Sequence, residues 1–182
     1  MFEDEETEAV LLVDASNAFN ALNRKAALHN VQYTCPELST FLHNIYQADA
    51  ELFLPNTEEV IYSREGTTQG GPESMAFYAV STTSLLKSQS ADPAKRVFYA
   101  DDGSGASKLV KLSEWWQELK VIGPPLGYDV NAGKSWLIVK PEYIDQAHEL
   151  FPDIRNITVD GHEFLGSFIG TAEATAAFVQ KK

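Results

Sequence analysis

Two short apolar runs, each followed directly by aspartate, constrain the fold of this chain more than any other feature. Residues 9–13 read Ala-Val-Leu-Leu-Val and precede Asp14, and residues 97–100 read Val-Phe-Tyr-Ala and precede Asp101 and Asp102. The first run has no polar interruption, which is typical of a central strand buried on both faces. A carboxylate at the end of such a strand is costly to bury unless it is paired or bound to a metal ion. We therefore expect the two strands to be neighbours, with Asp14 and Asp101 within reach of one cation.

The rest of the chain alternates helical patterns with short strands. Helices are expected from Ser16 or Asn17 to Asn30, from Pro36 onward, over residues 73–88, from Ser113 to 121, and over 141–151. Strands are expected over 50–54, 59–63 and 135–139 and in short pieces over 156–169, with a tight hairpin turn at Gly103–Gly105. This order predicts an α+β fold with a mainly antiparallel central sheet packed against helices on one face.

The charge balance argues against a surface that grips nucleic acid over its whole extent. The chain has 14 Lys and Arg against 26 Asp and Glu, which gives a formal net charge of −12. Five of the acids lie in the first eight residues, so the remainder carries −7. Because affinity for nucleic acid depends largely on Lys and Arg, we expect weak binding by this chain alone.

The cysteine content and the hydropathy argue against a disulfide-bonded, a zinc-binding or a membrane-spanning protein. Cys35 is the single cysteine, so neither an internal disulfide nor a Cys/His zinc cluster is expected. This indicates a reducing, intracellular location, without indicating the compartment. No apolar run approaches the ~18–20 residues of a membrane span, so no membrane partner is expected.

The strand-end aspartates suit a site for divalent metal. Carboxylates crowded at one point repel one another, and a hard cation such as Mg²⁺ relieves the repulsion. Two such ions about 3.5–4 Å apart can activate an attacking hydroxyl and stabilise a leaving pyrophosphate. Asp14 alone would be explained more simply as the start of a turn or a helix cap. The recurrence of the pattern at Asp101 and Asp102 favours the metal site.

Five segments resemble the motifs of reverse transcriptases, in the same order. The central segment, Tyr99-Ala100-Asp101-Asp102, resembles the Y-x-D-D box of that family. The others are Asp14–Phe19 (D-x-x-x-x-[FY]), Gln69–Pro72 (Q-G-x-P), Gly127–Ser135 (G-[FY]-x-x-N-x-x-K-[ST]) and Phe164–Gly166 (the F-L-G primer grip). Over residues 9–170 the chain is therefore similar to the palm domain of retroelement polymerases.

The resemblance implies a nucleotidyltransferase site with two Mg²⁺ ions, for which Mn²⁺ can substitute. Asp14 and Asp101 would ligate both ions, assisted by the backbone carbonyl of Ala15. Asp102 would be an auxiliary acid near the primer end. These residues are the predicted catalytic and metal-binding group.

The resemblance also implies contacts with nucleotide and primer. Phe19 would lie under the sugar of the incoming nucleotide and exclude a 2′-hydroxyl, with a core aromatic on a helix face as the alternative. Gln69 and Gly70 would line the nascent base pair and template, with an ordinary capped loop as the alternative. Lys134 would meet the triphosphate or protonate pyrophosphate, unless it is a solvated surface lysine. The implied primer-binding residues are Tyr99, Leu165 and Gly166.

The implied organisation is an acidic leader over 1–8, a reverse-transcriptase-like palm over 9–155, and a primer-grip-like hairpin with a C-terminal tail over 156–182. Fingers before the first motif and a thumb after the last are expected to be missing. The resemblance thus implies an incomplete RNA-directed DNA polymerase. Its partners would be an RNA template, a DNA primer and deoxynucleoside triphosphates.

Two other functions stay open at this point. An RNA-directed RNA polymerase shares the palm but uses a G-D-D box, and both Ala100 and Phe19 argue against it. A catalytically inert or domesticated palm would act as a structural or binding module. The acidic surface favours that alternative, and the intact Asp14, Asp101 and Asp102 disfavour it.

Overall fold

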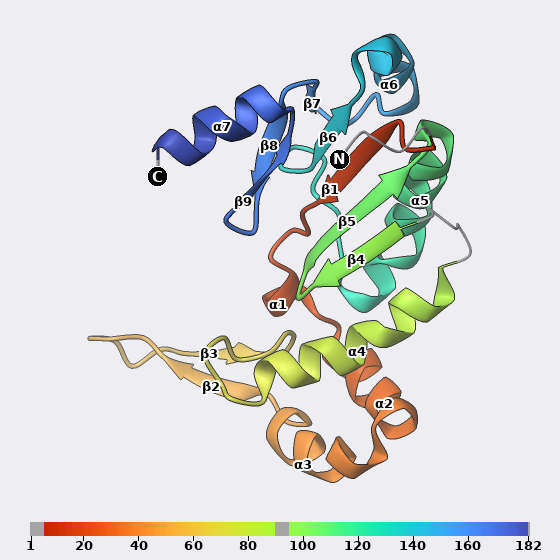
Figure 1. Cartoon of the computed structure of the whole chain (residues 1–182). Helices are drawn as coiled ribbons and strands as arrows, with labels where there is room; N and C mark the ends of the chain where they lie inside the picture. The colour runs from red at the N-terminus through yellow and green to blue at the C-terminus, as the bar shows by residue number, and fades with distance from the viewer. Residues whose placement is uncertain (1–5, 90–94, 182) are drawn as a thin grey trace. The chain divides into compact units, whose positions relative to one another are not determined.

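A computed structural model describes residues 6–89 and 95–181 (Figure 1). The chain forms two compact units, and each contains buried apolar side chains. The sheet unit comprises the described residues of Met1–Ala15, Ser90–Lys120 and Val130–Lys182, and the helical unit comprises Ser16–Gln89 and Val121–Asp129. Residues 1–5 of the predicted leader lie outside the described residues. The limits 9–155 and 156–182 follow the order of the motifs and stay predictions.

The sheet unit is built on a five-stranded mixed sheet in the order β4-β5-β1-β6-β7. The pairs β4–β5, β5–β1 and β1–β6 are antiparallel, and β6–β7 is parallel. The α+β class is confirmed. The strands are β1 (Ala9–Val13), β4 (Lys95–Tyr99), β5 (Asp102–Ser107), β6 (Trp136–Val139) and β7 (Asn156–Thr158).

The prediction that the two apolar runs are neighbouring strands is wrong, because β5 lies between β1 and β4. Strand β5 begins at Asp102, so the second aspartate pair returns next to β1 through the β4–β5 turn. Strand β5 was not predicted because its sequence is polar and rich in glycine and lacks the apolar alternation that indicates a strand.

None of the helices in the described part of the chain is long and apolar enough to cross a membrane.

The sheet unit contains further helices and strands besides the five-stranded sheet. The elements are α5 (Leu109–Ile122), whose last residues belong to the helical unit, η2 (Pro141–Tyr143), α6 (Ile144–Leu150), β8 (Gly161–Phe164), β9 (Ser167–Gly170) and α7 (Ala172–Lys181).

Strand β1 is buried on both faces, as its uninterrupted apolar sequence predicts. No residue of β1 is more than 4% exposed. On one face of the sheet, the Trp115 ring of α5 packs against Gly105 of β5. On the other face, Val10 and Leu12 form a cluster that Phe164 of the β8–β9 hairpin partly covers. The end of β1 therefore emerges from a core that is closed on both sides.

The turn between β4 and β5 consists of Ala100 and Asp101. Tyr99 pairs with Asp102 across it, so the Y-x-D-D segment is itself a two-residue hairpin. The turn expected at Gly103–Gly105 is wrong, since these residues lie inside β5.

Ring packing explains the two glycines of β5. A Cβ atom at Gly103 would lie 2.9 Å from the Phe98 ring, and one at Gly105 would lie 2.7 Å from the Trp115 ring. The Phe98 and Trp115 rings meet edge to face, with centroids 5.9 Å apart. Glycine here permits the close approach of large rings, which a turn-based interpretation does not anticipate.

Helix α5 begins at Leu109, four residues before the predicted cap Ser113. The Glu8 carboxylate accepts a hydrogen bond from the Leu109 N–H at 2.9 Å and so satisfies the helix N-terminus. The Ser113 hydroxyl donates instead to the Leu150 carbonyl at 3.2 Å. A cap from so distant a segment leaves no local sequence signal.

The helical unit contains a helical hairpin, a β-hairpin and a longer helix. Helix α2 packs against both α3 and α4. The helices predicted from Pro36 and over 73–88 are confirmed, and so is the hairpin. The elements are α1 (Ala18–Ala21), α2 (Arg24–Thr34), α3 (Pro36–Tyr46), β2 (Ala50–Phe53), β3 (Val60–Ser63), α4 (Ser74–Ser88) and η1 (Pro124–Leu126).

The single helix predicted from Ser16 or Asn17 to Asn30 is in fact two helices. Leu22 leaves the helical conformation, with φ −49° and ψ 122°, and ends α1. The Asn23 side chain caps α2 by accepting a hydrogen bond from the Ala26 N–H at 3.0 Å. Asn17 adopts a left-handed backbone with φ 50°, and its side chain makes no cap bond.

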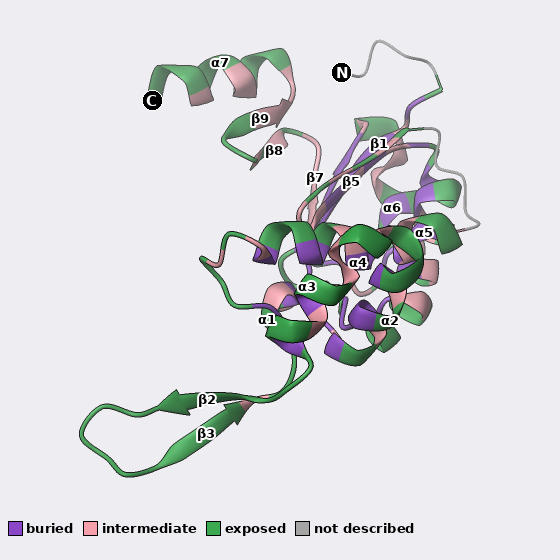
Figure 2. Cartoon of the chain, turned by 90° about the horizontal axis from the view of Figure 1, so that it is seen from below, coloured by how far each residue is buried: buried purple, intermediate pink, exposed green. Residues whose placement is uncertain are grey.

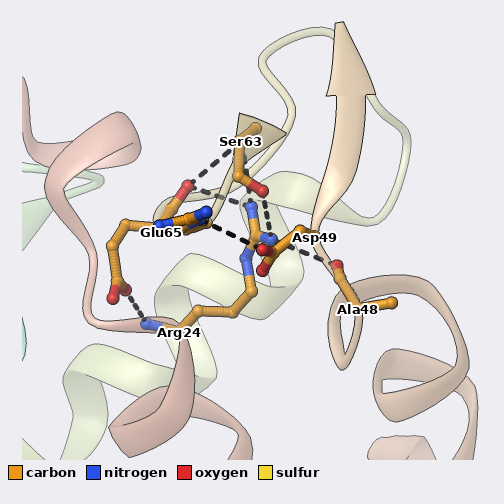
Figure 3. A network of polar contacts seen from close by, with 6 residues as sticks. Arg24, Ala48, Asp49, Ser63 and Glu65 are labelled. Atoms are coloured by element: carbon orange, nitrogen blue, oxygen red, sulfur yellow. Dashed lines mark hydrogen bonds and ion pairs between the residues drawn. The ribbon is translucent and has the colours of Figure 1, made fainter. Parts of the chain in front are cut away.

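Arg24 anchors the base of the β2–β3 hairpin (Figure 3). Its side chain is buried, and its guanidinium lies 5.5 Å from the centroid of the Tyr46 ring. A buried guanidinium needs partners for its donors. It donates to four backbone carbonyls, those of Ala48, Ser63 (3.0 Å), Glu65 (2.9 Å) and Gly66 (3.1 Å).

The hydroxyl of Tyr46 continues this polar network toward α4. It donates to the Glu73 carboxylate at 2.8 Å and accepts from the Thr68 N–H at 3.4 Å. The Ser74 hydroxyl donates to the Thr68 carbonyl. Buried polar contacts therefore hold the loop over residues 64–73 at both of its ends.

Candidate functional site

Asp14 directly follows β1, and the segment before β6 holds its backbone. The Asp14 N–H donates to the Ser135 hydroxyl at 3.1 Å, and its carbonyl accepts from the Asn131 N–H at 2.8 Å. The Asn131 side chain in turn accepts from the backbone N–H of Lys134 at 3.2 Å. These contacts orient the Asp14 backbone without using its carboxylate.

Asp101 and Asp102 lie where the neighbouring hairpin turns. Val13 pairs with Gly103, so extending this register by one residue sets Asp14 opposite Asp102. In the turn, Ala100 has φ 57°, a left-handed conformation that costs about 1–2 kcal/mol for a residue with a Cβ. Strain of this kind persists only where the surrounding structure imposes it, and it is frequent at functional sites.

The three aspartates form one electrostatically coupled group. The pKa of Asp14 is raised, mainly because the carboxylate is partly buried. The positive charge of Lys134 acts to lower this pKa, and the negative charge of Asp101 acts to raise it. Burial also raises the pKa of Asp102, and the charges of Asp101 and Asp14 raise it further. The three carboxylates that the sequence singled out therefore lie within electrostatic range of one another, and their sharing of one cation stays a prediction.

The donor chemistry of this group fits a hard divalent cation. Asp14 Oδ2 is buried and has no hydrogen-bond partner within residues 6–89 and 95–181. Such an oxygen is unfavourable until a cation or proton satisfies it. The described residues contain no group of three or more His, Cys, Asp or Glu side chains arranged to hold a metal ion. One or two carboxylates, completed by water and substrate phosphates, are the ligands that Mg²⁺ commonly uses.

Asp14 and Asp102 line a cavity of about 220 Å³ in the sheet unit. Lys134, predicted to meet the triphosphate, lies on the same cavity, and so does Leu165 of the predicted primer-binding set. With Glu163, three acids and one lysine line this cavity, which therefore combines cation-binding and anion-binding groups.

Two stacked aromatic side chains that line this cavity were not predicted as site residues. Trp136 and His162 stack with centroids 3.8 Å apart and an interplanar angle of 10°. Burial lowers the pKa of His162, and the charge of Glu163 opposes this. The one available signal was position, because Trp136 follows the Lys134-Ser135 segment and His162 precedes Phe164.

A second cavity, of about 400 Å³, lies in the helical unit. Phe19, Gln69 and Gly70, the residues predicted to contact the nucleotide and template, all line it. Phe19 is half-buried, and its ring stacks on Tyr78 with centroids 4.4 Å apart. Phe19 is therefore a packed aromatic that also lines a cavity, and its contact with the sugar of a nucleotide stays a prediction.

The remaining predicted site residues are placed as follows. Ala15 is buried and makes an isolated antiparallel bridge to Val130. Tyr99 is exposed on β4. Leu165 and Gly166 form the β8–β9 turn with positive φ values of 50° and 76°.

At neutral pH without divalent cations, Asp14→Asn is expected to raise the melting temperature. Because burial raises the pKa of Asp14, the folded state binds this proton more tightly than the unfolded state. The resulting stabilisation is complete below the ordinary pKa of 3.8 and is lost as pH rises through the raised value. Thermal unfolding between pH 3 and 8 in EDTA should show the variant's advantage growing with pH.

Asp153→Asn is a control for which the expected change in melting temperature has the opposite sign. Burial acts to raise the pKa of Asp153, but hydrogen bonds from Lys120 at 2.7 Å and Trp116 at 3.1 Å lower it overall. Its stabilisation is therefore present above pH 3.8 and is lost as pH falls through the lowered value. At pH 7 this variant should have a lower melting temperature. Shifts of the same sign in both variants would contradict the electrostatic account of Asp14.

No protein family and no curated protein matches the sequence. Nine chains of known structure match the fold. One is described as the structure of apo telomerase from Candida tropicalis truncated from the C-terminal domain, with a TM-score of 0.67 and 12% sequence identity. The match covers 93% of this chain and 35% of that one, so this chain spans about a third of the telomerase chain. Telomerase is a reverse transcriptase, and at this identity the likeness concerns the fold alone. The fold of this chain is therefore reverse-transcriptase-like.

Proposed function

We propose that this chain is the palm of an RNA-directed DNA polymerase, which adds deoxynucleotides to a primer 3′-hydroxyl on an RNA template. The observation that carries the proposal is the electrostatically coupled group of Asp14, Asp101 and Asp102 in a reverse-transcriptase-like fold, with an Asp14 Oδ2 that has no hydrogen-bond partner in the described part of the chain. Asp14 and Asp102 line one cavity, and neighbouring carboxylates are the groups that two-metal nucleotidyl transfer requires.

In this proposal, the protein's own groups hold the metals and orient the reactants. Asp14 and Asp101 would hold two Mg²⁺ or Mn²⁺ ions, with the Ala15 carbonyl as a further ligand and Asp102 as an auxiliary acid. The bound ions would activate the primer hydroxyl and neutralise the developing charge on pyrophosphate. Lys134 would meet a triphosphate oxygen or protonate the leaving group, a role supported by its place on the cavity of Asp14.

The remaining predicted residues would contact the nucleotide and the primer. Phe19 would lie under the sugar, and Gln69 and Gly70 would line the nascent base pair. Tyr99, Leu165 and Gly166 would contact the primer. A net charge of −12 leaves few phosphate contacts, so the chain alone would bind an RNA–DNA hybrid weakly.

A catalytically inert palm is the second candidate. It is favoured by the lack, among the described residues, of a metal-binding group of three or more His, Cys, Asp or Glu side chains. An RNA-directed RNA polymerase is the less favoured alternative, because Ala100 replaces the glycine of its G-D-D box and Phe19 stands at the sugar position.

Single-nucleotide addition tests the proposal and the role of Phe19 together. With the chain in excess over a DNA primer on RNA, at low salt with Mn²⁺, we expect slow addition of deoxynucleotide in preference to ribonucleotide. Phe19→Val should reduce this preference by about ten- to a hundredfold, because the ring no longer collides with a 2′-hydroxyl. The measurement is the ratio of the two addition rates.

Phe19→Tyr is the matched control, since it keeps the ring and should keep the preference. Unchanged discrimination in Phe19→Val would leave Phe19 as a packed aromatic alone. Stabilisation by Mn²⁺ without any nucleotide addition would support the inert palm.

A further inference from the structure

The β2–β3 hairpin exposes apolar side chains on both of its faces. Phe53 is 73% exposed and Ile61 is 48% exposed. Phe53 pairs with Val60, and Ile61 pairs with Leu52, so the two pairs face opposite sides of the ribbon. Figure 2 shows both strands as almost entirely exposed. In the described part of the chain, packing within the fold therefore does not account for apolar side chains at these positions.

The backbone of the hairpin is equally uncovered. Its two strands form a sheet of their own in the described part of the chain, so each strand has one unpaired edge. An isolated two-stranded hairpin is marginally stable in water, and stability requires a third strand or a packed helix. An exposed apolar edge is also a template for another strand. Arg24 holds only the base of the hairpin, through the carbonyls of Ala48 and Ser63.

The charge of the hairpin selects its partner. Residues 50–63 contain Glu51, Glu58 and Glu59, all exposed, and no Lys, Arg or His. A second copy of the hairpin would bring the same three negative charges, and a nucleic acid would bring phosphates. Both would be repelled, whereas a basic strand would gain attraction and apolar contact.

We propose that the β2–β3 hairpin is the docking site for an extended segment of a partner protein, in which apolar residues alternate with Lys or Arg. The segment adds to the hairpin as a further strand. Main-chain hydrogen bonds supply the binding, and alternate side chains supply the specificity. This site is independent of the proposed polymerase function, so either can fail without the other.

The test uses the full chain and a fluorescent peptide of about six residues, a common strand length, in which valine alternates with lysine. Glu58→Lys with Glu59→Lys should weaken binding about tenfold, because each exposed attraction becomes a repulsion. Glu114→Lys with Glu149→Lys makes the same change in net charge at exposed positions of the sheet unit. It should change binding less than about twofold.

One further measurement separates strand addition from general electrostatic attraction. A peptide of the same sequence with alternate N-methylated amides keeps the charge but loses the backbone donors along one edge, so its binding should fall. Circular dichroism and melting temperature establish that the variants are folded. The proposal is overturned if the methylated peptide binds equally well, or if both charge variants weaken binding equally. It is also overturned if sedimentation shows a dimer that Phe53→Ser dissociates, or if an RNA–DNA hybrid binds at the hairpin.

Discussion

Asp14→Asn and Asp101→Asn are each expected to slow Mn²⁺-dependent addition of one deoxynucleotide by about a hundred- to a thousandfold, as removal of one preorganised charge-stabilising group does in other enzymes. Asparagine keeps the shape of the side chain but removes the charge that holds a cation. Asp14 is the sharper case, because its buried Oδ2 has no hydrogen-bond partner within the described residues. The measurement is the single-turnover rate with saturating deoxynucleotide.

Asp145→Asn is the control for this experiment. Asp145 is exposed in the first turn of α6, outside the residues that line either cavity. Its substitution should leave the rate unchanged. Millimolar Mn²⁺ should also raise the melting temperature of the wild type more than that of Asp101→Asn, because a ligand that binds the folded state stabilises it. Equal rates in all four proteins would remove the aspartates from the chemistry.

Arg24→Met is expected to lower the free energy of unfolding by about 3–5 kcal/mol. Methionine preserves most of the apolar stem but removes the guanidinium donors to four backbone carbonyls, of which that of Glu65 keeps a hydrogen bond from the Ser63 hydroxyl. The loss should be large because Arg24 is 6% exposed, so water cannot readily replace the guanidinium. Equilibrium unfolding in urea, followed by circular dichroism, measures it.

Arg64→Met is the matched control, since Arg64 lies at the same hairpin base. Its guanidinium pairs with Asp49 at 3.1 Å, but the Arg64 side chain is 72% exposed. Exposed ion pairs contribute about 0–1 kcal/mol, so the control should cost no more than that. Similar losses in the two variants would show that the buried contacts of Arg24 add little to stability.

The elements that the sequence predicted well are those with strong local patterns. Strand β1 has five consecutive apolar residues and is buried on both faces. Helix α3 begins at Pro36, whose fixed φ suits a first helical position. In such segments the side-chain pattern and the capping residue already specify the conformation.

The errors fall where a distant segment decides the local structure. Gly103 and Gly105 lie inside a strand because the rings of Phe98 and Trp115 pack onto them. Helix α5 begins early because Glu8 caps it. The split between α1 and α2 had a local signal, since Asn23 is a favourable cap, but the apolar periodicity through it favoured one helix.

The candidate site shows the same division. The residue types and order around Asp14, Asp101 and Asp102 were sufficient to predict a reverse-transcriptase-like fold, which the likeness to telomerase supports. The coupling of the three carboxylates required the insertion of β5 beside β1, and the Trp136–His162 stack required the β8–β9 hairpin.

The sequence by itself therefore determined the class of fold, the main helices and the strand-end carboxylates, because each depends on neighbours within a few residues. Only the tertiary structure decided which strand lies beside β1, why Arg24 is buried, and which oxygen of Asp14 lacks a hydrogen-bond partner among the described residues. These properties depend on desolvation and on hydrogen bonds between segments far apart in the chain. The corresponding free energies of desolvation and hydrogen bonding arise only when those segments come into contact.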